Sequence, residues 1–300
     1  MKSTGDFFVS VRSHPIAVFA GDIKIAHSIF ALPFAIVGVI LSGAGLPTPE
    51  TVSLLLVAMV SARSFAMGAN RLLDADVDAM NPRTRMRAVP SGRLDLRSGW
   101  IITVAAAAVF IAAAFALSPL CGGLSFPLLL ILAFYSHMKR LSWLTHWYLG
   151  LCLGLAPVAA SIALTGGVTL PAVLVAIAVT MWTAGFDILY SLQDRSFDEE
   201  NGLHSVPARF GVRRSLWISR IAFGAMIALL LAAGILSGAG LPWYAGVAGV
   251  AALLCWEHWI LRDSAGTVDG KIIDKAFFTA NAWVSVVFCA AAVLDRVIAQ

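Results

Sequence analysis

Charged residues are scarce in this chain of 300 residues. Asp, Glu, Lys and Arg together make up 13% of it, about half of the roughly 25% found in ordinary soluble domains. Hydrophobic residues account for 59%, and the mean hydropathy is +0.86. This balance excludes an ordinary water-soluble domain, because most of the chain prefers an apolar surrounding.

Cysteine is also rare, with four residues in the whole chain. They lie within separate apolar stretches, at spacings unlike those of metal-binding motifs. The four positions are Cys121, Cys152, Cys255 and Cys289. The sequence therefore gives no support to a zinc or haem site, and we expect buried, unreactive thiols.

The first 24 residues lack the apolar core and the Ala-x-Ala cleavage site of a signal peptide. Lys2, Arg12 and Asp22 are interspersed there with apolar residues. We therefore expect residues 1–24 to form an uncleaved interfacial segment, followed by one membrane domain over residues 25–300.

Long apolar segments fill the rest of the chain. Most are roughly 18 to 23 residues long, enough to cross about 30 Å of hydrocarbon at 1.5 Å per residue. Backbone polar groups in lipid must be satisfied internally, which requires helices. We predict an all-α polytopic membrane protein with nine transmembrane helices around a central cavity. The expected spans are 25–45, 51–72, 100–117, 121–138, 146–165, 170–192, 215–237, 242–262 and 274–294.

Basic residues occur in every second connection between these spans. The connections 46–50, 118–121, 165–169 and 238–241 contain no Lys or Arg. By the positive-inside rule, the N-terminus and the basic connections face the cytoplasm and the C-terminus lies outside the cytoplasmic (inner) membrane. A pI near 9.0 is then explained by orientation and anionic lipid, so we expect no nucleic-acid partner.

Two acidic clusters lie at the ends of the second and sixth spans. In the first, Asn70, Asp74 and Asp78 recur every four residues, which places them within about 80° of one helix face. Arg63 lies on the same face, two turns deeper, and an Arg inside a span is a candidate functional residue. In the second cluster, steps of three and four residues again keep one face. It comprises Asp187, Tyr190, Asp194 and Asp198.

Carboxylates four residues apart on a helix repel one another, so we expect a compensating cation. Mg²⁺ prefers oxygen ligands and commonly binds through one or two carboxylates together with substrate phosphates. Two facing pairs, with basic residues beside them, would form a receptor for a magnesium diphosphate. The basic candidates are Lys139, Arg140, Arg85 and Arg87. The alternative is that each cluster is a set of solvated charges at a helix end, and we expect this of Asp76, which points off the shared face.

Three separated motifs resemble the UbiA family of intramembrane prenyltransferases. The first is Asn70-x-x-x-Asp74-x-x-x-Asp78, followed by Arg83-Thr84-x-x-Arg87-x-x-Pro90-Ser91-Gly92. The second is Asp187-x-x-Tyr190-x-x-x-Asp194-x-x-x-Asp198, followed by Gly202-Leu203-x-Ser205-x-Pro207. The third is Tyr135-x-x-x-Lys139-Arg140. Arg71 departs from the pattern, since many members have Asp after the Asn, so no ligand role is carried over to it.

The resemblance is strongest to the 4-hydroxybenzoate polyprenyltransferase-like branch, which includes proteins of the futalosine route to menaquinone. It implies that Asp74, Asp78, Asp194 and Asp198 hold Mg²⁺, with Asn70 beside them, and that a polyprenyl diphosphate ionises there to an allylic cation. A small aromatic acid of the 4-hydroxybenzoate or dihydroxynaphthoate type would then be prenylated in quinone biosynthesis. The candidate acceptor-binding residues are Arg63, Lys24, His27, Asp187 and Tyr190.

Two alternatives stay open. The acceptor could instead be of the homogentisate, haem or chlorophyll type. A secondary transporter also has repeated halves and charges within the membrane, but its polar groups are expected near the bilayer midplane. In this sequence the acidic residues cluster at the ends of two spans, which favours the enzyme.

Overall fold

The computed structural model describes residues 14–23, 32–261 and 270–299, and these residues contain helices but no strands. Two short helices come first, α1 (Pro15–Asp22) and α2 (Leu32–Leu41). The remaining α-helices are α3 (Pro49–Leu73), α4 (Ala75–Met80), α5 (Leu96–Leu117), α6 (Pro119–Leu141), α7 (Thr145–Thr165), α8 (Leu170–Tyr190), α9 (Arg195–Glu200), α10 (Val206–Ser237), α11 (Leu241–Leu261) and α12 (Gly270–Ile298). A 3₁₀ turn, η2 (Ser191–Asp194), joins α8 to α9.

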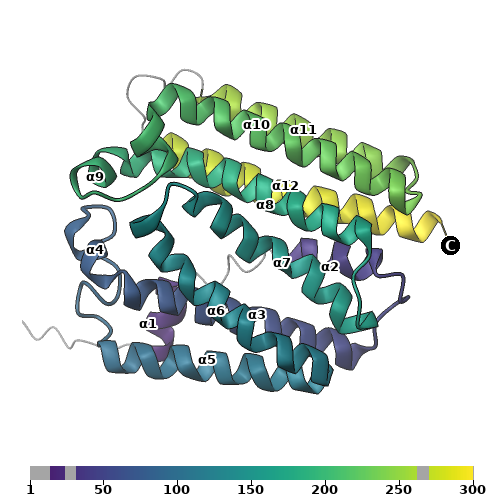
Figure 1. The fold of residues 1–300 in the computed structure, drawn as a ribbon, viewed down its shortest axis with the longest axis horizontal. Helices are drawn as coiled ribbons and strands as arrows, with labels where there is room; N and C mark the ends of the chain where they lie inside the picture. The colour runs from purple at the N-terminus through teal and green to yellow at the C-terminus, as the bar shows by residue number, and fades with distance from the viewer. Residues whose placement is uncertain (1–13, 24–31, 262–269, 300) are drawn as a thin grey trace, which may run out of the picture.

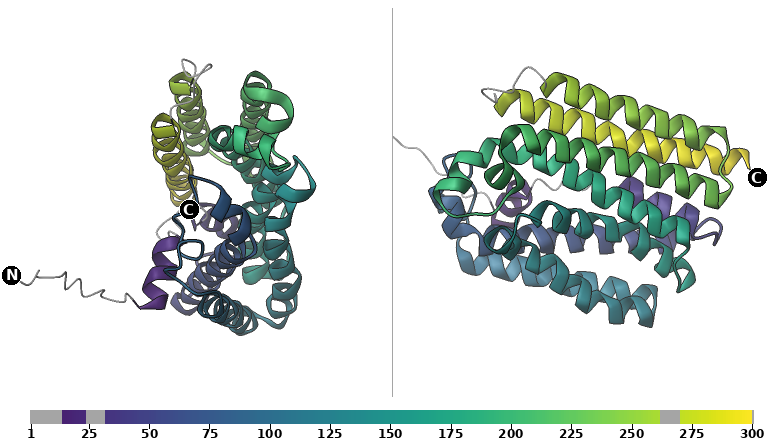
Figure 2. Two further views of the ribbon diagram at one scale, coloured as in Figure 1. Left: turned by 90° about the vertical axis from the view of Figure 1, so that its left-hand side faces the viewer. Right: turned by 45° about the horizontal axis from the view of Figure 1, so that its top comes forward.

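The long helices lie side by side as one bundle, and α8 runs through its middle (Figures 1 and 2). Helix α8 packs against α7 on one side and α10 on the other, while α11 pairs with α12 and α3 pairs with α5. The short helices α4 and α9 lie at the same end of the bundle, on the left in Figure 1. Two segments separated by more than 100 residues are thereby brought together.

Seven helices in the described part of the chain are long and apolar enough to cross a membrane. The predicted all-α membrane fold is confirmed. The count of nine stays a prediction, because α2 is a ten-residue apolar helix beside residues 24–31, which are outside the described ranges, and α11 is not among the seven. The division at residue 24 also stays a prediction.

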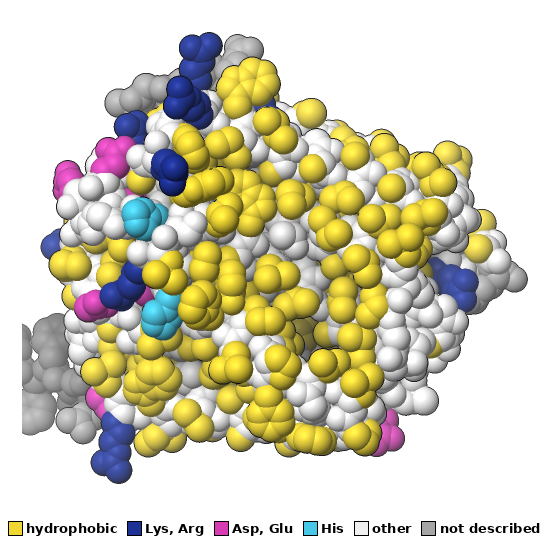
Figure 3. Space-filling view, in the orientation of Figure 1, with side chains coloured by type: hydrophobic (Ala, Val, Ile, Leu, Met, Phe, Trp, Pro, Cys, Tyr) yellow, Lys and Arg dark blue, Asp and Glu magenta, His cyan; other side chains and the backbone are white. Residues whose placement is uncertain are grey.

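The outer surface of the bundle is apolar over its middle. Large side chains such as Leu130, Ile221 and Trp217 are 72%, 69% and 56% exposed, and hydrophobic atoms cover much of the face seen in Figure 3, with charged groups gathered mainly at the left-hand end. Apolar patches of this extent are unusual on soluble monomers. The surface is that of an integral membrane protein, whose solvent over the middle of the bundle is lipid.

Close approach between α7 and α8 depends on two glycines. A Cβ atom at Gly150 would lie 2.3 Å from the carbonyl oxygen of Thr180, and one at Gly154 would lie 2.4 Å from the Thr180 hydroxyl. Small residues four apart allow two membrane helices to approach at backbone distance. Because α7 and α8 carry residues of the polar end described below, this contact also fixes the site.

Replacing Gly150 with Ala is therefore expected to destabilise the protein by about 1–3 kcal/mol, the usual cost of overpacking a close contact. Thermal unfolding in detergent, followed by circular dichroism, measures the change. Gly123→Ala is the matched control, because Gly123 is also helical but has no atom within 4 Å of the added Cβ. Equal melting temperatures for the two variants would contradict the proposed backbone contact.

Candidate active site

Both acidic clusters lie where a long helix ends. Helix α3 stops at Leu73, Asp74 adopts a non-helical conformation (φ −99°, ψ 9°), and α4 begins at Ala75. Helix α8 likewise stops at Tyr190 and passes through the 3₁₀ turn into α9. Each cluster therefore contains a break between helices, although its residues keep the spacing of one helix face. The chain leaves the apolar bundle at these points, where Asp and Ser side chains compete with the helical backbone for hydrogen bonds.

The two helix ends enclose one polar cavity of about 170 Å³, similar to the roughly 150 Å³ that holds a benzene ring in an engineered core. It has room for a diphosphate-sized group but not for a polyprenyl chain. The predicted site residues that line it are Asn70, Asp74, Asp78, Arg87, Lys139, Arg140, Asp187, Tyr190 and Asp194. Asp198 is fully buried behind the lining. The structure thus brings nearly all of both clusters to one place.

Each aspartate of the two pairs has its own basic partner from another segment. The nitrogen–oxygen distances are 3.6 Å for Arg140 with Asp74, 2.6 Å for Arg87 with Asp78, 2.5 Å for Arg83 with Asp194 and 2.8 Å for Lys139 with Asp198. The compensating cations expected from the sequence are therefore present as side chains. Arg140 also pairs with Asp76 at 2.9 Å, and Asp187 in the same cavity has His146 as its partner.

The connection after α4 reaches across the cavity to the second cluster. Asn81 donates a hydrogen bond to Asp194 Oδ1 at 3.1 Å, and Arg83 donates to the same oxygen at 2.9 Å. Arg83 also donates to the hydroxyl of Tyr190 at 3.0 Å. Neither Asn81 nor Arg83 was predicted as a site residue, although Arg83 is part of the first motif. These bonds hold the two halves of the site in register.

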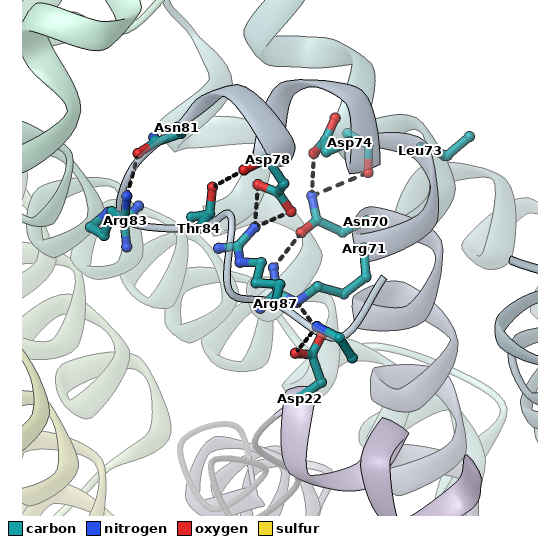
Figure 4. Close-up of polar contacts among 12 residues, drawn as sticks. Asp22, Asn70, Arg71, Leu73, Asp74, Asp78, Asn81, Arg83, Thr84 and Arg87 are labelled. Carbon is teal, nitrogen blue, oxygen red and sulfur yellow. Dashed lines mark hydrogen bonds and ion pairs between the residues drawn. The ribbon is translucent and has the colours of Figure 1, made fainter. Parts of the chain in front are cut away.

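Asn70 is oriented by Arg71, as Figure 4 shows. The Asn70 amide donates to Asp74 at 2.7 Å and to Ser136 at 3.3 Å, while its oxygen accepts from Arg71 at 3.2 Å. Arg71 in turn contacts Asp22 of α1 at 3.4 Å. The residue that departs from the family pattern thus packs beneath the cluster and fixes the amide of Asn70.

Burial and the neighbouring Asp78 raise the pKa of Asp74 to about 6. Asp198 is more deeply buried than Asp74, with 0% of it exposed. It forms an ion pair with Lys139, and neither of its oxygens has a hydrogen-bond partner among the described residues. Asp76 differs from both, because its side chain is 64% exposed and pairs with Arg140 at the surface. The expected contrast between Asp76 and the clustered aspartates is present in the structure.

Deeper in the cavity, Asp187 pairs with a residue that sequence analysis missed. The Nδ1 atom of His146, in the first turn of α7, lies 2.7 Å from Asp187 Oδ2. His146 lines the cavity as well. It stands seven residues after Lys139, but α6 ends at Leu141 and α7 begins at Thr145, so the two residues do not share one helix face.

Of the other predicted residues, Arg63 and Arg85 lie outside the cavity lining. Arg63 is within α3, and its Nε atom is buried without a hydrogen-bond partner among the described residues. Arg85 is exposed. Lys24 and His27 fall outside the described ranges.

The donor set fits a hard cation, since carboxylate oxygens are the ligands that Mg²⁺ prefers. No group of three or more His, Cys, Asp or Glu side chains is preassembled around a metal position in the described part of the chain, because the carboxylates are taken up by Arg and Lys. Oδ2 of Asp198, which has neither a hydrogen bond nor an ion pair among the described residues, is consistent with a cation approaching this end. Any metal must therefore replace side-chain cations.

Fold and cavity together define a polytopic α-helical membrane protein with a charged site at one end of the bundle. Residues 31–293 match the UbiA prenyltransferase family, and the chain belongs to that family, so it is a prenyltransferase. This membership excludes the transporter alternative.

Relatives and solved structures agree with this assignment. The chain is 30% identical to the 4-hydroxybenzoate octaprenyltransferase of Nitrosococcus oceani over 251 residues, 83% of this chain and 85% of that one. Its structure matches a UbiA homolog from Aeropyrum pernix with a TM-score of 0.81 and 32% identity, covering 90% and 98% of the two chains. A UbiA homolog from Archaeoglobus fulgidus, bound to DMAPP and Mg²⁺, has the same fold, with a TM-score of 0.70 and 17% identity over 93% and 99%.

Proposed function

We propose that this protein transfers a polyprenyl group from polyprenyl diphosphate to a ring carbon of a small hydroxylated aromatic acid, in a magnesium-dependent reaction of quinone biosynthesis. The observation that carries the proposal is the single cavity in which carboxylates from two helix ends alternate with Arg and Lys. The name of the Nitrosococcus relative supports an acceptor of the 4-hydroxybenzoate type, and a dihydroxynaphthoate is of the same class.

Mg²⁺ would be held by Asp74, Asp78, Asp194 and Asp198, and when bound it supplies positive charge that stabilises the departing diphosphate. The basic side chains of the protein would bind the diphosphate itself. In the structure the carboxylates are neutralised by Arg83, Arg87, Lys139 and Arg140. If the carboxylates bound Mg²⁺ instead, these basic side chains would donate hydrogen bonds to phosphate oxygens. This exchange of partners leaves every buried charge paired, which avoids the free-energy cost of burying an unpaired charge.

The acceptor is assigned to the inner wall of the cavity, where Asp187 and Tyr190 lie. Arg63 would receive its carboxylate, since a guanidinium offers two parallel donors. Lys24 and His27 are proposed to help there. The basic connections motivate a further proposal, that the cavity end and the N-terminus face the cytoplasm and the C-terminus lies outside the inner membrane.

One experiment tests the proposed reaction directly. The purified protein is incubated with Mg²⁺, labelled geranyl or farnesyl diphosphate and a panel of aromatic acceptors, and the product is identified by mass. We expect a C-prenylated hydroxy acid that does not form when the metal is chelated. The panel includes homogentisate, since its prenylation in preference to both hydroxy acids would replace the proposed acceptor. Product formation without a divalent metal would contradict the metal role.

Mg²⁺ and the diphosphate are expected to bind cooperatively. Either one alone has to displace ion pairs without replacing both partners, whereas together they satisfy carboxylates and basic groups at once. A non-reactive prenyl thiodiphosphate should therefore raise the affinity for Mg²⁺ by about 10- to 100-fold, a typical coupling between sites. Calorimetric titration of Mg²⁺ with and without the analogue measures the ratio. A ratio near one would show that the ion pairs do not oppose binding.

A further inference from the structure

The pair formed by His146 and Asp187 is the polar feature of the cavity that binding of a magnesium diphosphate does not require. His146 is 1% exposed and Asp187 is 19% exposed. Each of the four paired aspartates described above has an Arg or Lys partner, but no such ion pair involves Asp187 among the described residues. Asp187 is thus a cavity carboxylate whose hydrogen-bond partner is a histidine rather than a permanent cation.

The backbone fixes which nitrogen of His146 carries the proton. The N–H of Val206 lies 3.2 Å from His146 Nε2. Because a backbone N–H can only donate, Nε2 must present its lone pair. A neutral imidazole then carries its hydrogen on Nδ1 and donates it to Asp187 Oδ2 at 2.7 Å.

This arrangement leaves one carboxylate oxygen of Asp187 available. Oδ2 is held by His146, while Oδ1 makes no hydrogen bond to a described residue, and the side chain lines the cavity. The negative charge therefore faces the cavity. Fixed orientation of this kind lets a carboxylate act on a bound substrate without reorganising.

The depth of Asp187 suits contact with the acceptor. It precedes Asp194 by seven residues, roughly 10 Å along a helix, so it lies further into the bundle than the carboxylates assigned to the metal. The reacting carbon of the donor is bonded to the diphosphate at the cavity mouth. An aromatic ring that attacks this carbon from inside the bundle is then placed between the diphosphate and Asp187.

We propose that Asp187 is the catalytic residue that removes the ring proton, and that His146 is its positioning residue. The inference rests on the proposed function. As the bond between C1 and the diphosphate oxygen breaks, its electron pair leaves with the diphosphate, and a π pair of the ring forms the new C–C bond. The ring cation then loses its C–H proton to Asp187 Oδ1, and the C–H electron pair restores aromaticity. The proton passes from Asp187 to water at the cavity mouth.

A deuterated acceptor distinguishes this role from a structural one. In the wild type, loss of the ring proton is expected to be fast, so deuterium at the reacting ring positions leaves turnover unchanged. Asp187→Asn should lower turnover about 10²–10⁴-fold, the usual effect of removing a general base, and should introduce a primary isotope effect. Binding of the thiodiphosphate with Mg²⁺ should stay at the wild-type level, which shows that the variant is folded.

His146 is tested by two substitutions. His146→Leu abolishes the hydrogen bond to Asp187 and should give the same isotope effect. His146→Gln retains a donor and an acceptor, and should stay within about tenfold of the wild type, the worth of one net hydrogen bond. Thr183→Val is the matched control: Thr183 lies one turn from Asp187 on α8, is buried, and its hydroxyl has no partner among the described residues.

Asp187→Asn with wild-type turnover and no isotope effect would overturn the inference, because the proton would then be taken elsewhere, for instance by the released diphosphate. Loss of donor binding in both Asp187→Asn and His146→Leu would also overturn it, since the pair would then be a cross-link between α7 and α8. If the wild-type protein prenylates no aromatic acid, the proposed function itself is wrong. This result is obtained before any variant is compared.

Discussion

Replacing Asp194 with Ala is expected to lower prenyl transfer by about 10³-fold or more, the upper range for removing one preorganised electrostatic group from a site. The variant loses a proposed metal ligand and at the same time leaves Arg83 without the carboxylate that it contacts at 2.5 Å. Asp78→Ala should behave alike, because Asp78 is buried and pairs with Arg87 at 2.6 Å. Labelled product formed at saturating Mg²⁺ and donor measures both effects.

Asp76→Ala is the matched control. Asp76 belongs to the same short helix as Asp78, but its side chain is 64% exposed and pairs at the surface with Arg140. Surface ion pairs contribute at most about 1 kcal/mol, so the loss should stay under about tenfold. Equal losses at Asp76 and Asp194 would show that the depth of the carboxylate does not matter, and would remove the basis for assigning these residues to a metal.

The fold was predictable from the sequence because lipid imposes a length on apolar helices. Most expected spans agree with the observed helices within a few residues. The main difference is at α10, where a short helical stretch with a Ser205 N-cap precedes a kink at Gly211 (φ 75°). The helix that follows this kink begins within a few residues of the expected start at 215. Hydropathy detects the membrane-crossing part of a helix but not a polar extension outside it.

The convergence of the two acidic clusters was predictable for a related reason. Spans two and six both run toward the same side, so their ends lie at the same membrane face. The four-residue spacing of the first cluster is kept across the break between α3 and α4, because Asp78 N still donates to Asp74 O at 2.8 Å. The breaks themselves were missed. They depend on where the bundle stops excluding water, which a periodic pattern does not encode.

The sequence did not show which side chains would form hydrogen bonds with each other within the site. Asn81 bonds a carboxylate 113 residues away, and His146 bonds one 41 residues away. Such pairs are set by how whole helices pack. Asn81 does stand three residues after Asp78, a helical spacing, but that spacing does not show that Asn81 bonds a carboxylate of the second cluster. The sequence also could not show that Asp74, Asp78, Asp194 and Asp198 are already paired with Arg or Lys. These ion pairs change the expected binding of Mg²⁺ from independent to cooperative.

Arg63 is expected to decide whether the acceptor is an acid. A guanidinium within a span is costly unless an anion or hydrogen-bond partner compensates it, and the Nε of Arg63 has no such partner among the described residues. Arg63→Ala should therefore raise the KM for the aromatic acid about 100-fold, the worth of a charge-assisted hydrogen bond, while the KM for the prenyl diphosphate stays unchanged. Arg63→Lys should be intermediate, since an ammonium lacks the bidentate geometry.

The decisive comparison varies the acceptor as well as the protein. The methyl ester of the same hydroxy acid has no carboxylate charge, so its KM should be equal in the wild type and in Arg63→Ala. Ser64→Ala is the control for general disturbance of α3, because among the described residues the Ser64 hydroxyl bonds only the backbone of its own helix, at Val60. Lys24→Ala is measured in parallel, since it is the other proposed cation. If both Arg63→Ala and Lys24→Ala leave the KM for the acid unchanged while donor use is normal, the carboxylate assignment fails. A neutral phenol or quinol then becomes the acceptor that fits this cavity, since nothing else in the proposal requires an anionic ring.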